Sequence, residues 1–193
     1  RADWLGRLLD IFSSPCEILK QKPERLSEEG KISLETASKF LETASRLDAE
    51  AELEKTDKVN GKIYFKGEEG YPDVRGVLPA ENSANAAMVG TRKITPYGRR
   101  AASKLAEDLA LAGVILVSGL ARGVDTAVHS AAVRNGKPTL ALIGTGIGRC
   151  YPAENRELAR GILDTGGAII SELPFDAPPL AQHFPRRNRL IAG

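Results

Sequence analysis

The residues best suited to chemistry are glycines and cations in short loops of the second half of the chain. The first of these loops contains Gly90, Thr91, Arg92 and Lys93 and follows the apolar residues 88–89. Glycine lets backbone N–H groups approach an anion, and the hydroxyl and the two cations add further donors. This loop therefore predicts an anion site, and phosphate is the anion we expect there.

Later loops repeat the same combination of glycine and arginine. They contribute a second set of candidates for phosphate contact, which are Ser118, Gly119, Arg122, Gly123, Gly144, Thr145, Gly146, Arg149, Arg186, Arg187 and Arg189, with Glu172 at the same edge. Arginine supplies paired donors, and helix N-termini add partial positive charge. A single phosphate would need one such loop, so four loops predict a site for several phosphates in a row.

The elements that must position these loops alternate in a regular way. Uninterrupted apolar runs predict buried parallel strands at residues 86–89, 114–117, 139–143 and 168–171. Helical patterns follow each run, and their apolar stripes fit helices that cover a sheet. In parallel sheets ligands bind at the carboxyl ends of the strands, where the glycine and arginine loops fall. We therefore predict an α/β domain over residues 87–193, with an extended Rossmann-like parallel sheet and flanking helices.

The start of the chain has a different pattern. Apolar residues at helical spacing, interrupted by Ser, Pro and Gly, predict a small all-helical domain at residues 1–52 that resembles a helix-hairpin-helix or sterile-alpha-motif unit. Residues 48–57 are charged and are predicted to end in a solvated linker. Residues 53–86 form a lead-in segment, with a possible strand at 62–65 and a turn at 70–72.

Charge and composition narrow the class of protein. Residues 87–193 carry 14 Lys and Arg against 8 Asp and Glu, whereas residues 1–86 carry 13 against 17. The basic half suits a polyanionic partner. Only Cys16 and Cys150 are present, which favours a reducing cytoplasm over a disulfide framework. With two histidines, no apolar run of about 20 residues and no signal pattern, we predict neither a metal site nor membrane association.

Several residues near the predicted edge have alternative roles. Asp125 fits a helix cap better than a catalytic base, and His129 fits packing or a bond to a neighbouring loop better than ligation. Glu172 is expected to orient arginines through ion pairs. Phe184 is equally compatible with core packing and with stacking on a base, and Tyr151 is a second stacking candidate.

Five motifs in order resemble the DNA-processing protein A (DprA, or Smf) family from about residue 88 onward. They are Val89-Gly90-Thr91-Arg92 with Tyr97-Gly98, Ser118-Gly119-Leu120-Ala121-Arg122-Gly123-Val124-Asp125 with His129, Tyr151-Pro152 with Asn155, Ser171-Glu172, and Phe184-Pro185-Arg186-Arg187-Asn188-Arg189 with Ile191-Ala192-Gly193.

The resemblance implies a protein that binds single-stranded DNA, forms a homodimer and helps to load the recombinase RecA in natural transformation. It also implies DNA contacts at Gly90, Thr91, Arg92, Ser118, Gly119, Arg122, Phe184, Arg186, Arg187, Asn188 and Arg189, with Arg156 as a further cation. Family chains continue beyond the residue equivalent to Gly193, and the dimer and RecA contacts are expected in that continuation.

The interpretation that we favour is stoichiometric binding, with no catalytic residue and no cofactor. One alternative is a nucleotide-monophosphate phosphoribohydrolase on the same kind of fold, although its Pro-Gly-Gly-x-Gly-Thr loop is absent from the sequence. Another alternative makes the helical residues 4–52 a protein-interaction module, with the α/β domain as its scaffold.

Overall fold

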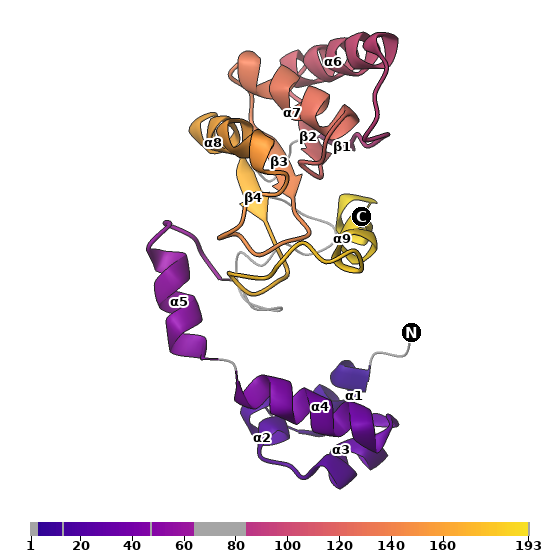
Figure 1. Cartoon of the computed structure of the whole chain (residues 1–193), viewed down its shortest axis with the longest axis vertical. Helices are drawn as coiled ribbons and strands as arrows, with labels where there is room; N and C mark the ends of the chain where they lie inside the picture. Colours follow the sequence, from indigo (N-terminus) through magenta and orange to yellow (C-terminus); the bar gives the residue numbers. More distant parts are fainter. Residues whose placement is uncertain (1–3, 13, 47, 64–83, 193) are drawn as a thin grey trace. The chain divides into compact units, whose positions relative to one another are not determined.

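The computed structural model describes residues 4–12, 14–46, 48–63 and 84–192. The chain divides into two compact units, Arg1–Leu53 and Glu54–Gly193, which are coloured from indigo to yellow along the sequence in Figure 1. Each unit has its own hydrophobic cluster and is described by itself.

The first unit is helical, as its sequence pattern predicts. It contains α1 (Trp4–Ile11), α2 (Pro15–Leu19), α3 (Pro23–Gly30) and α4 (Leu34–Ser45). Serine side chains cap the N-termini of two of these helices. Ser14 accepts a hydrogen bond from the N–H of Glu17, and Ser33 accepts one from the N–H of Thr36. The helices enclose a small core, which consists of Leu8, Phe12, Ile18, Leu26 and Ala37.

The charged residues 48–57 are a helix, so the prediction of a linker there was wrong. Helix α5 (Ala49–Asp57) begins where Asp48 accepts a hydrogen bond from the N–H of Ala51 at 3.0 Å. Acidic residues in its first turn and Lys55 in its last turn both complement the helix dipole. Charge placement of this kind stabilises a helix that has little apolar surface to bury.

The second unit is built on a parallel sheet of four strands. Strands β1 (Asn85–Ala87), β2 (Ile115–Ser118), β3 (Thr139–Leu142) and β4 (Ala168–Ile170) pair in the order β1-β2-β3-β4. All three pairings are parallel. The four strands lie within one or two residues of the predicted ranges, so the predicted α/β fold is confirmed.

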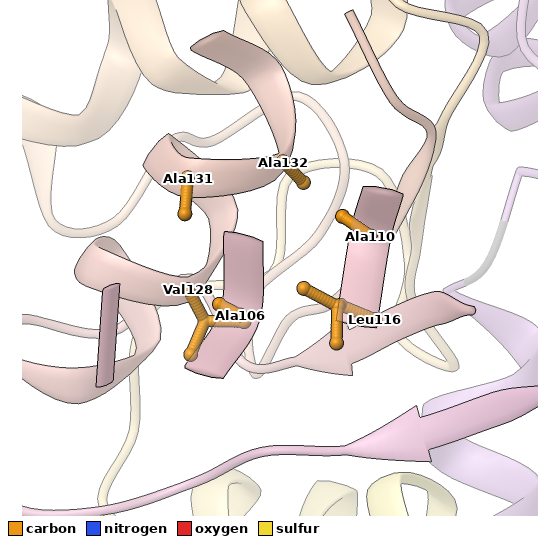
Figure 2. Close-up of a cluster of buried hydrophobic side chains, with 6 residues drawn as sticks. All are labelled: Ala106, Ala110, Leu116, Val128, Ala131 and Ala132. Carbon is orange, nitrogen blue, oxygen red and sulfur yellow. The ribbon is translucent and has the colours of Figure 1, made fainter. Parts of the chain in front are cut away.

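Helices cover both faces of this sheet. Helices α6 (Pro96–Leu111), α7 (Val124–Arg134) and α8 (Arg156–Asp164) connect successive strands, and a short 3-10 helix, η1 (Ala153–Asn155), precedes α8. Their face contains Leu116, which packs against alanines and a valine of α6 and α7, as Figure 2 shows with Ala106, Ala110, Val128, Ala131 and Ala132. Small side chains at this contact let the two helices approach each other closely.

Helix α9 (His183–Ala192) covers the opposite face. Its Ile191 packs against Ile115, Leu140 and Leu142, whose side chains point away from α6 and α7. Strand residues therefore alternate between two apolar environments, as the unbroken apolar runs of the sequence predict. In the view of Figure 1, α6 and α7 lie towards the top of this unit, α8 lies to the left of the strands, and α9 lies at their lower right.

Two sequence-based expectations fall wholly or partly outside the described residues. The possible strand at 62–65 is described only for Lys62 and Ile63, which have no regular secondary structure, and the turn at 70–72 is not described. Among the helices that the structure describes, none combines the length and the apolar character needed to cross a membrane.

Candidate nucleic-acid interface

The loops that follow the four strands lie at one edge of the sheet, because all the strands run in the same direction. Direct contacts join the first loop to the second. The N–H of Val124 donates to the carbonyl of Thr91 at 3.2 Å, and a Cβ at Gly90 would lie 2.6 Å from Cγ2 of Val124. Gly123 has a φ of 82°, and a Cβ there would collide with the carbonyl oxygen of Thr91. Gly90 and Gly123 are therefore required for this close contact between loops.

The first loop presents its two cations to solvent. The Thr91 hydroxyl accepts from the N–H of Lys93 at 3.1 Å, which fixes the turn, and Thr95 then caps α6 by accepting from the N–H of Gly98. Within the described part of the chain, neither Arg92 nor Lys93 is paired with a carboxylate. Both cations are thus available to an external anion.

An aromatic pair lies beside Arg92. The Arg92 guanidinium is 5.2 Å from the ring centroid of Phe184, which begins α9, and the Phe184 ring is 5.8 Å from that of Tyr151. Phe184 is half-buried because it packs against Gly144, whereas Tyr151 is exposed. This arrangement combines the two roles expected for Phe184, since one part of the ring packs on the third loop while the ring remains partly accessible.

Arg122 in the second loop is exposed but paired. Its Nε donates to the Glu154 carboxylate in η1, which joins the second loop to the third. This hydrogen bond raises the pKa of Arg122 and lowers the pKa of Glu154. A phosphate that binds Arg122 must displace or share this carboxylate.

Two backbone N–H groups of the second loop donate to a buried carboxylate of the protein itself. Asp125, which is 5% exposed, accepts from the N–H of Gly119 at 3.1 Å and of Ala121 at 3.3 Å. Asp125 was predicted to cap α7, but it lies in the first turn of the helix and bonds the preceding loop, while Gly123 occupies the cap position. The pKa of Asp125 is raised overall, because the effect of burial exceeds the opposing effect of these backbone N–H groups. The carboxylate therefore fills the position that an external phosphate would take in a glycine-rich cradle.

Two glycines of the third loop donate their N–H groups inside the protein. Gly146 donates to the carbonyl of Ala177, and Gly148 to that of Phe175, each at 3.0 Å. Arg149 donates through Nε to the carbonyl of Asp176 at 2.6 Å. These bonds tie the third loop to the proline-rich loop after β4, so the N–H groups of Gly146 and Gly148 are not available to a phosphate. Arg156, at the start of α8, is exposed.

The arginine-rich run on α9 divides into exposed and buried members. Arg186, Asn188 and Arg189 are exposed, and Arg189 donates through Nη2 to the carboxylate of Glu172. This bond confirms the expectation that Glu172 pairs with an arginine. Arg187 is only 6% exposed and donates through Nη1 to the carbonyls of Gly119 and Leu142. Its position differs from that expected of a phosphate contact, because its donors point into the protein.

Two further polar residues singled out in the sequence, Ser118 and His129, are buried. Ser118 donates its hydroxyl to the carbonyl of Met88 at 2.7 Å, and this bond holds β1 beside β2. His129 bonds through Nδ1 to the Thr139 hydroxyl at 2.9 Å, as expected for a residue that bonds to its neighbours. Ser118 and Gly119, which were both predicted to contact DNA, are buried. No cluster of His, Cys, Asp and Glu suited to a metal is found among the residues that the structure describes.

The structure thus brings most of the predicted cations to one edge, where some are exposed and unpaired, some are paired with glutamates, and Arg187 is buried. Among the predicted site residues, the cations that are exposed without a carboxylate partner in the described ranges are Arg92, Lys93, Arg156 and Arg186. Sequence reasoning did not identify Glu154 as the partner of Arg122. Asn155 was named only as part of a family motif, and its contact was not predicted: its side chain donates to the carbonyl of Leu120 at 2.9 Å. Nothing in the local pattern around these two residues indicates either contact.

Comparison with known proteins identifies the family. A family model described as DNA recombination-mediator protein A matches residues 73–193. The chain is 44% identical over 120 residues to Protein Smf of Escherichia coli (strain K12), which covers 62% of this chain and 32% of that protein. It is 39% identical over 119 residues to DNA processing protein DprA of Streptococcus pneumoniae (strain ATCC BAA-255 / R6). The matched region covers 62% of this chain and 42% of that protein. The chain therefore matches between about a third and two fifths of the length of these curated relatives.

Solved structures agree with this assignment. The X-ray structure of DprA from Streptococcus pneumoniae superposes with a TM-score of 0.69 at 28% identity, over 98% of this chain and 69% of that one. A structure of the Helicobacter pylori DNA processing protein A, which concerns the single-stranded DNA binding mode of that protein, gives a TM-score of 0.52 at 34% identity, over 56% and 48% of the two chains. The chain belongs to the DNA recombination-mediator protein A family, the DprA/Smf proteins.

Proposed function

We propose that the Glu54–Gly193 unit binds single-stranded DNA along the carboxyl edge of its sheet. The observation that carries this proposal is the position of the Arg92 guanidinium, which lies over the Phe184 ring, beside Tyr151, and has no carboxylate partner in the described ranges. A cation for the phosphate next to accessible rings for a base is the combination that single-stranded nucleic acid requires. The Helicobacter pylori relative, whose structure concerns binding of single-stranded DNA, supports the same substrate.

In the proposed mechanism, side-chain cations hold the phosphates. Arg92, Lys93 and Arg186 bind phosphates directly, and Arg122 and Arg189 exchange a glutamate for a phosphate. The backbone amides of Gly119, Ala121, Gly146 and Gly148 take no part, because they already donate to internal acceptors. Binding of this kind depends strongly on salt and weakly on sequence.

The aromatic pair provides selectivity for single strands. Phe184 and Tyr151 stack on bases that a single strand can turn outward, whereas the bases of a duplex remain stacked on one another. We therefore propose weaker binding of duplex DNA by the same edge.

The names of the relatives suggest a cellular role for the complete protein, which we include in the proposal. Its relatives are named as DNA processing proteins and its family as a recombination mediator. We propose that the complete protein acts in the cytoplasm as a homodimer, protects incoming single-stranded DNA and helps to load RecA onto it. Binding is stoichiometric in this scheme and requires neither catalysis nor a cofactor.

The first test is a change of Arg92 to Ala. We expect weaker binding of single-stranded oligonucleotides of every sequence and a salt slope, log Kd against log salt, that falls by about one unit, because one phosphate contact is lost. Fluorescence anisotropy over a salt series measures both quantities. Arg134→Ala is the matched control, because Arg134 is exposed at the far end of α7. An unchanged slope in Arg92→Ala would remove Arg92 from the site.

The phosphoribohydrolase alternative makes a different prediction. Such an enzyme would release free base from nucleoside monophosphates, which chromatography of the incubated mixture detects. Base release by the wild-type chain, lost in the Arg92 variant, would contradict the scheme of binding alone.

A further inference from the structure

Arg187 differs from the other arginines of α9 in its surroundings. It is 6% exposed, whereas Arg186 and Arg189 lie at the surface. The Nη1 group of Arg187 donates to the carbonyl of Gly119 at 2.8 Å and to that of Leu142. These two carbonyls lie at the carboxyl ends of β2 and β3. The hydrogen atoms of Nη1 are therefore used inside the protein.

The peptide groups of Gly119 are held on both sides. Its N–H donates to Asp125 at 3.1 Å, and its carbonyl accepts from Arg187. A Cβ at this position would lie only 2.7 Å from Cζ of Arg187, which is closer than any real contact. The guanidinium thus lies directly against the backbone of the second loop, and glycine is required for that contact.

The rest of the second loop is fixed in the same way. Leu120 has a φ of 56°, in the left-handed region that residues other than glycine rarely adopt, and its carbonyl accepts from Asn155 at 2.9 Å. The carbonyl of Ala121 accepts from the Thr126 hydroxyl at 2.7 Å. Three successive carbonyls therefore accept from side chains of α9, η1 and α7. Arg122 follows directly, so its position depends on these bonds.

Burying a guanidinium costs free energy of folding, because the charged group loses its hydration. Burial lowers the pKa of Arg187, and the charge of Asp125 only partly offsets this effect. The positive charge also lowers the pKa of the neighbouring His129. An apolar residue would fill this position at lower cost but could not donate the two hydrogen bonds of Nη1, so these two bonds are what Arg187 contributes to the structure.

We infer that Arg187 is a positioning residue, which ties α9 to the second loop and thereby holds the exposed arginines of both elements in one arrangement. Arg187 and Gly119 are 68 positions apart in the sequence. The tie places Arg186 and Arg189 of α9 at a fixed distance from Arg122. This inference rests on the proposed function, because the arrangement serves to bind one DNA strand.

Lysine and glutamine substitutions of Arg187 test this role, and the same substitutions of its neighbour Arg186 are the controls. Lysine keeps a charge that can bind phosphate, but it cannot bond both carbonyls in the geometry of the guanidinium. We expect Arg187→Lys to weaken binding of an oligothymidylate of about 20 nucleotides by about tenfold, as much as Arg187→Gln does. At Arg186 we expect the opposite pattern. Arg186→Lys keeps the affinity within about twofold, and Arg186→Gln lowers the salt slope by about one unit.

Amide hydrogen exchange of the full chain without DNA provides a second readout. We expect Arg187→Lys to speed exchange in residues 119–122 and in α9, while amides in β2 and in the middle of α6 keep their protection. A merely destabilised fold would exchange faster everywhere, so the local pattern is specific to the tie. This measurement does not depend on DNA binding.

Gly119→Ala tests the tie without removing a cation, and it serves if the Arg187 variants fail to fold. Its Cβ would displace the guanidinium, so we expect weaker binding with an unchanged number of arginines. Wild-type affinity in Arg187→Lys or in Gly119→Ala would overturn the inference, and so would unchanged exchange in residues 119–122. Absence of DNA binding by the wild-type chain would instead contradict the proposed function.

Discussion

Two arginines at the candidate interface are paired with glutamates, Arg122 with Glu154 and Arg189 with Glu172. Ion pairs between exposed side chains contribute little stability, so a phosphate can replace the carboxylate. Each replacement, however, leaves an unpaired glutamate carboxylate beside the bound DNA, and this negative charge repels the phosphates. We therefore expect these two arginines to contribute less to affinity than the unpaired Arg92.

Replacement of Glu154 by Gln tests this competition. We expect binding of single-stranded DNA to strengthen by about threefold, because Arg122 loses its internal anion, which is an effect in the range of exposed ion pairs. Titrations at low salt measure the change. Glu157→Gln is the matched control, since Glu157 pairs with Arg160 on the same helix. Weaker binding in Glu154→Gln would mean that the glutamate orients Arg122 rather than competing with DNA.

A change of Phe184 to Leu separates stacking from charge. We expect single-stranded binding to weaken by about 1–3 kcal/mol with an unchanged salt slope, because a base loses its aromatic partner while every phosphate contact remains. Binding of a duplex of equal length, measured by the same method, is the control and is expected to change little. An equal loss for both substrates would assign Phe184 to the core alone.

At the scale of elements, a buried chain of hydrogen bonds joins α7 to two strands. The Thr139 hydroxyl of β3 donates to the carbonyl of Leu116 in β2 at 2.7 Å, so its oxygen accepts from Nδ1 of His129 in α7. Burial, with a smaller contribution from Arg187, lowers the pKa of His129 from 6.5 to about 3. The folded protein therefore keeps this imidazole neutral in mildly acidic solution.

This pKa predicts the direction of a pH effect on stability. As the pH falls from 6.5 towards 3, the unfolded chain binds a proton at His129 that the folded chain does not, so the free energy of unfolding decreases. We expect this one group to contribute a loss of up to about 1.4 kcal/mol per pH unit in that range. Urea unfolding of wild type and His129→Asn measures it, and the variant should show a shallower dependence on pH.

His183→Gln is the control for that comparison, because His183 is not buried and lies at the start of α9, where its Nδ1 bonds the carbonyl of Pro178 at 3.1 Å. It should keep the pH dependence of the wild type. A pH dependence in His129→Asn as steep as that of the wild type would contradict the assignment.

The sequence predicted the strands well where their composition is distinctive. The run that contains β2 is uninterrupted and β-branched, so burial on both faces could be inferred directly. Helix α5 was missed because its stability comes from charge placement rather than from an apolar stripe. The backbone partners of Gly119 and Gly146 could not be inferred, since they depend on long-range packing of Asp125 and of the loop after β4.

The role of Arg187 was missed for a different reason, although the sequence holds a signal for it. The run from Arg186 to Arg189 resembles a continuous exposed charge cluster. On a helix, however, consecutive residues point about 100° apart, so the run cannot face one side. Arg187 lies four residues before Ile191, which is also buried, and both therefore share the inner face of α9.

For the whole molecule, the division into two units predicts separable functions. We expect a chain that lacks residues 1–53 to bind single-stranded DNA within about twofold of the full chain, because the candidate residues all lie in the Glu54–Gly193 unit. Anisotropy titrations of both proteins test this expectation. Arg92→Ala in the shortened chain provides the control and should lower the salt slope as it does in the full chain. A loss of tenfold or more would assign part of the DNA contact to the helical unit.

The hydrogen bonds that Gly146 and Gly148 donate to the loop after β4 also determine which small molecules can compete at this edge. Mononucleotides dock on Rossmann-type folds chiefly through free amides at a glycine-rich turn and the adjacent helix N-terminus. Here those two amides are occupied, and what remains for an incoming anion is a set of separated side-chain cations. If this edge binds DNA as proposed, we expect ATP to compete poorly for it and an elongated polyanion to compete better than a compact purine analogue.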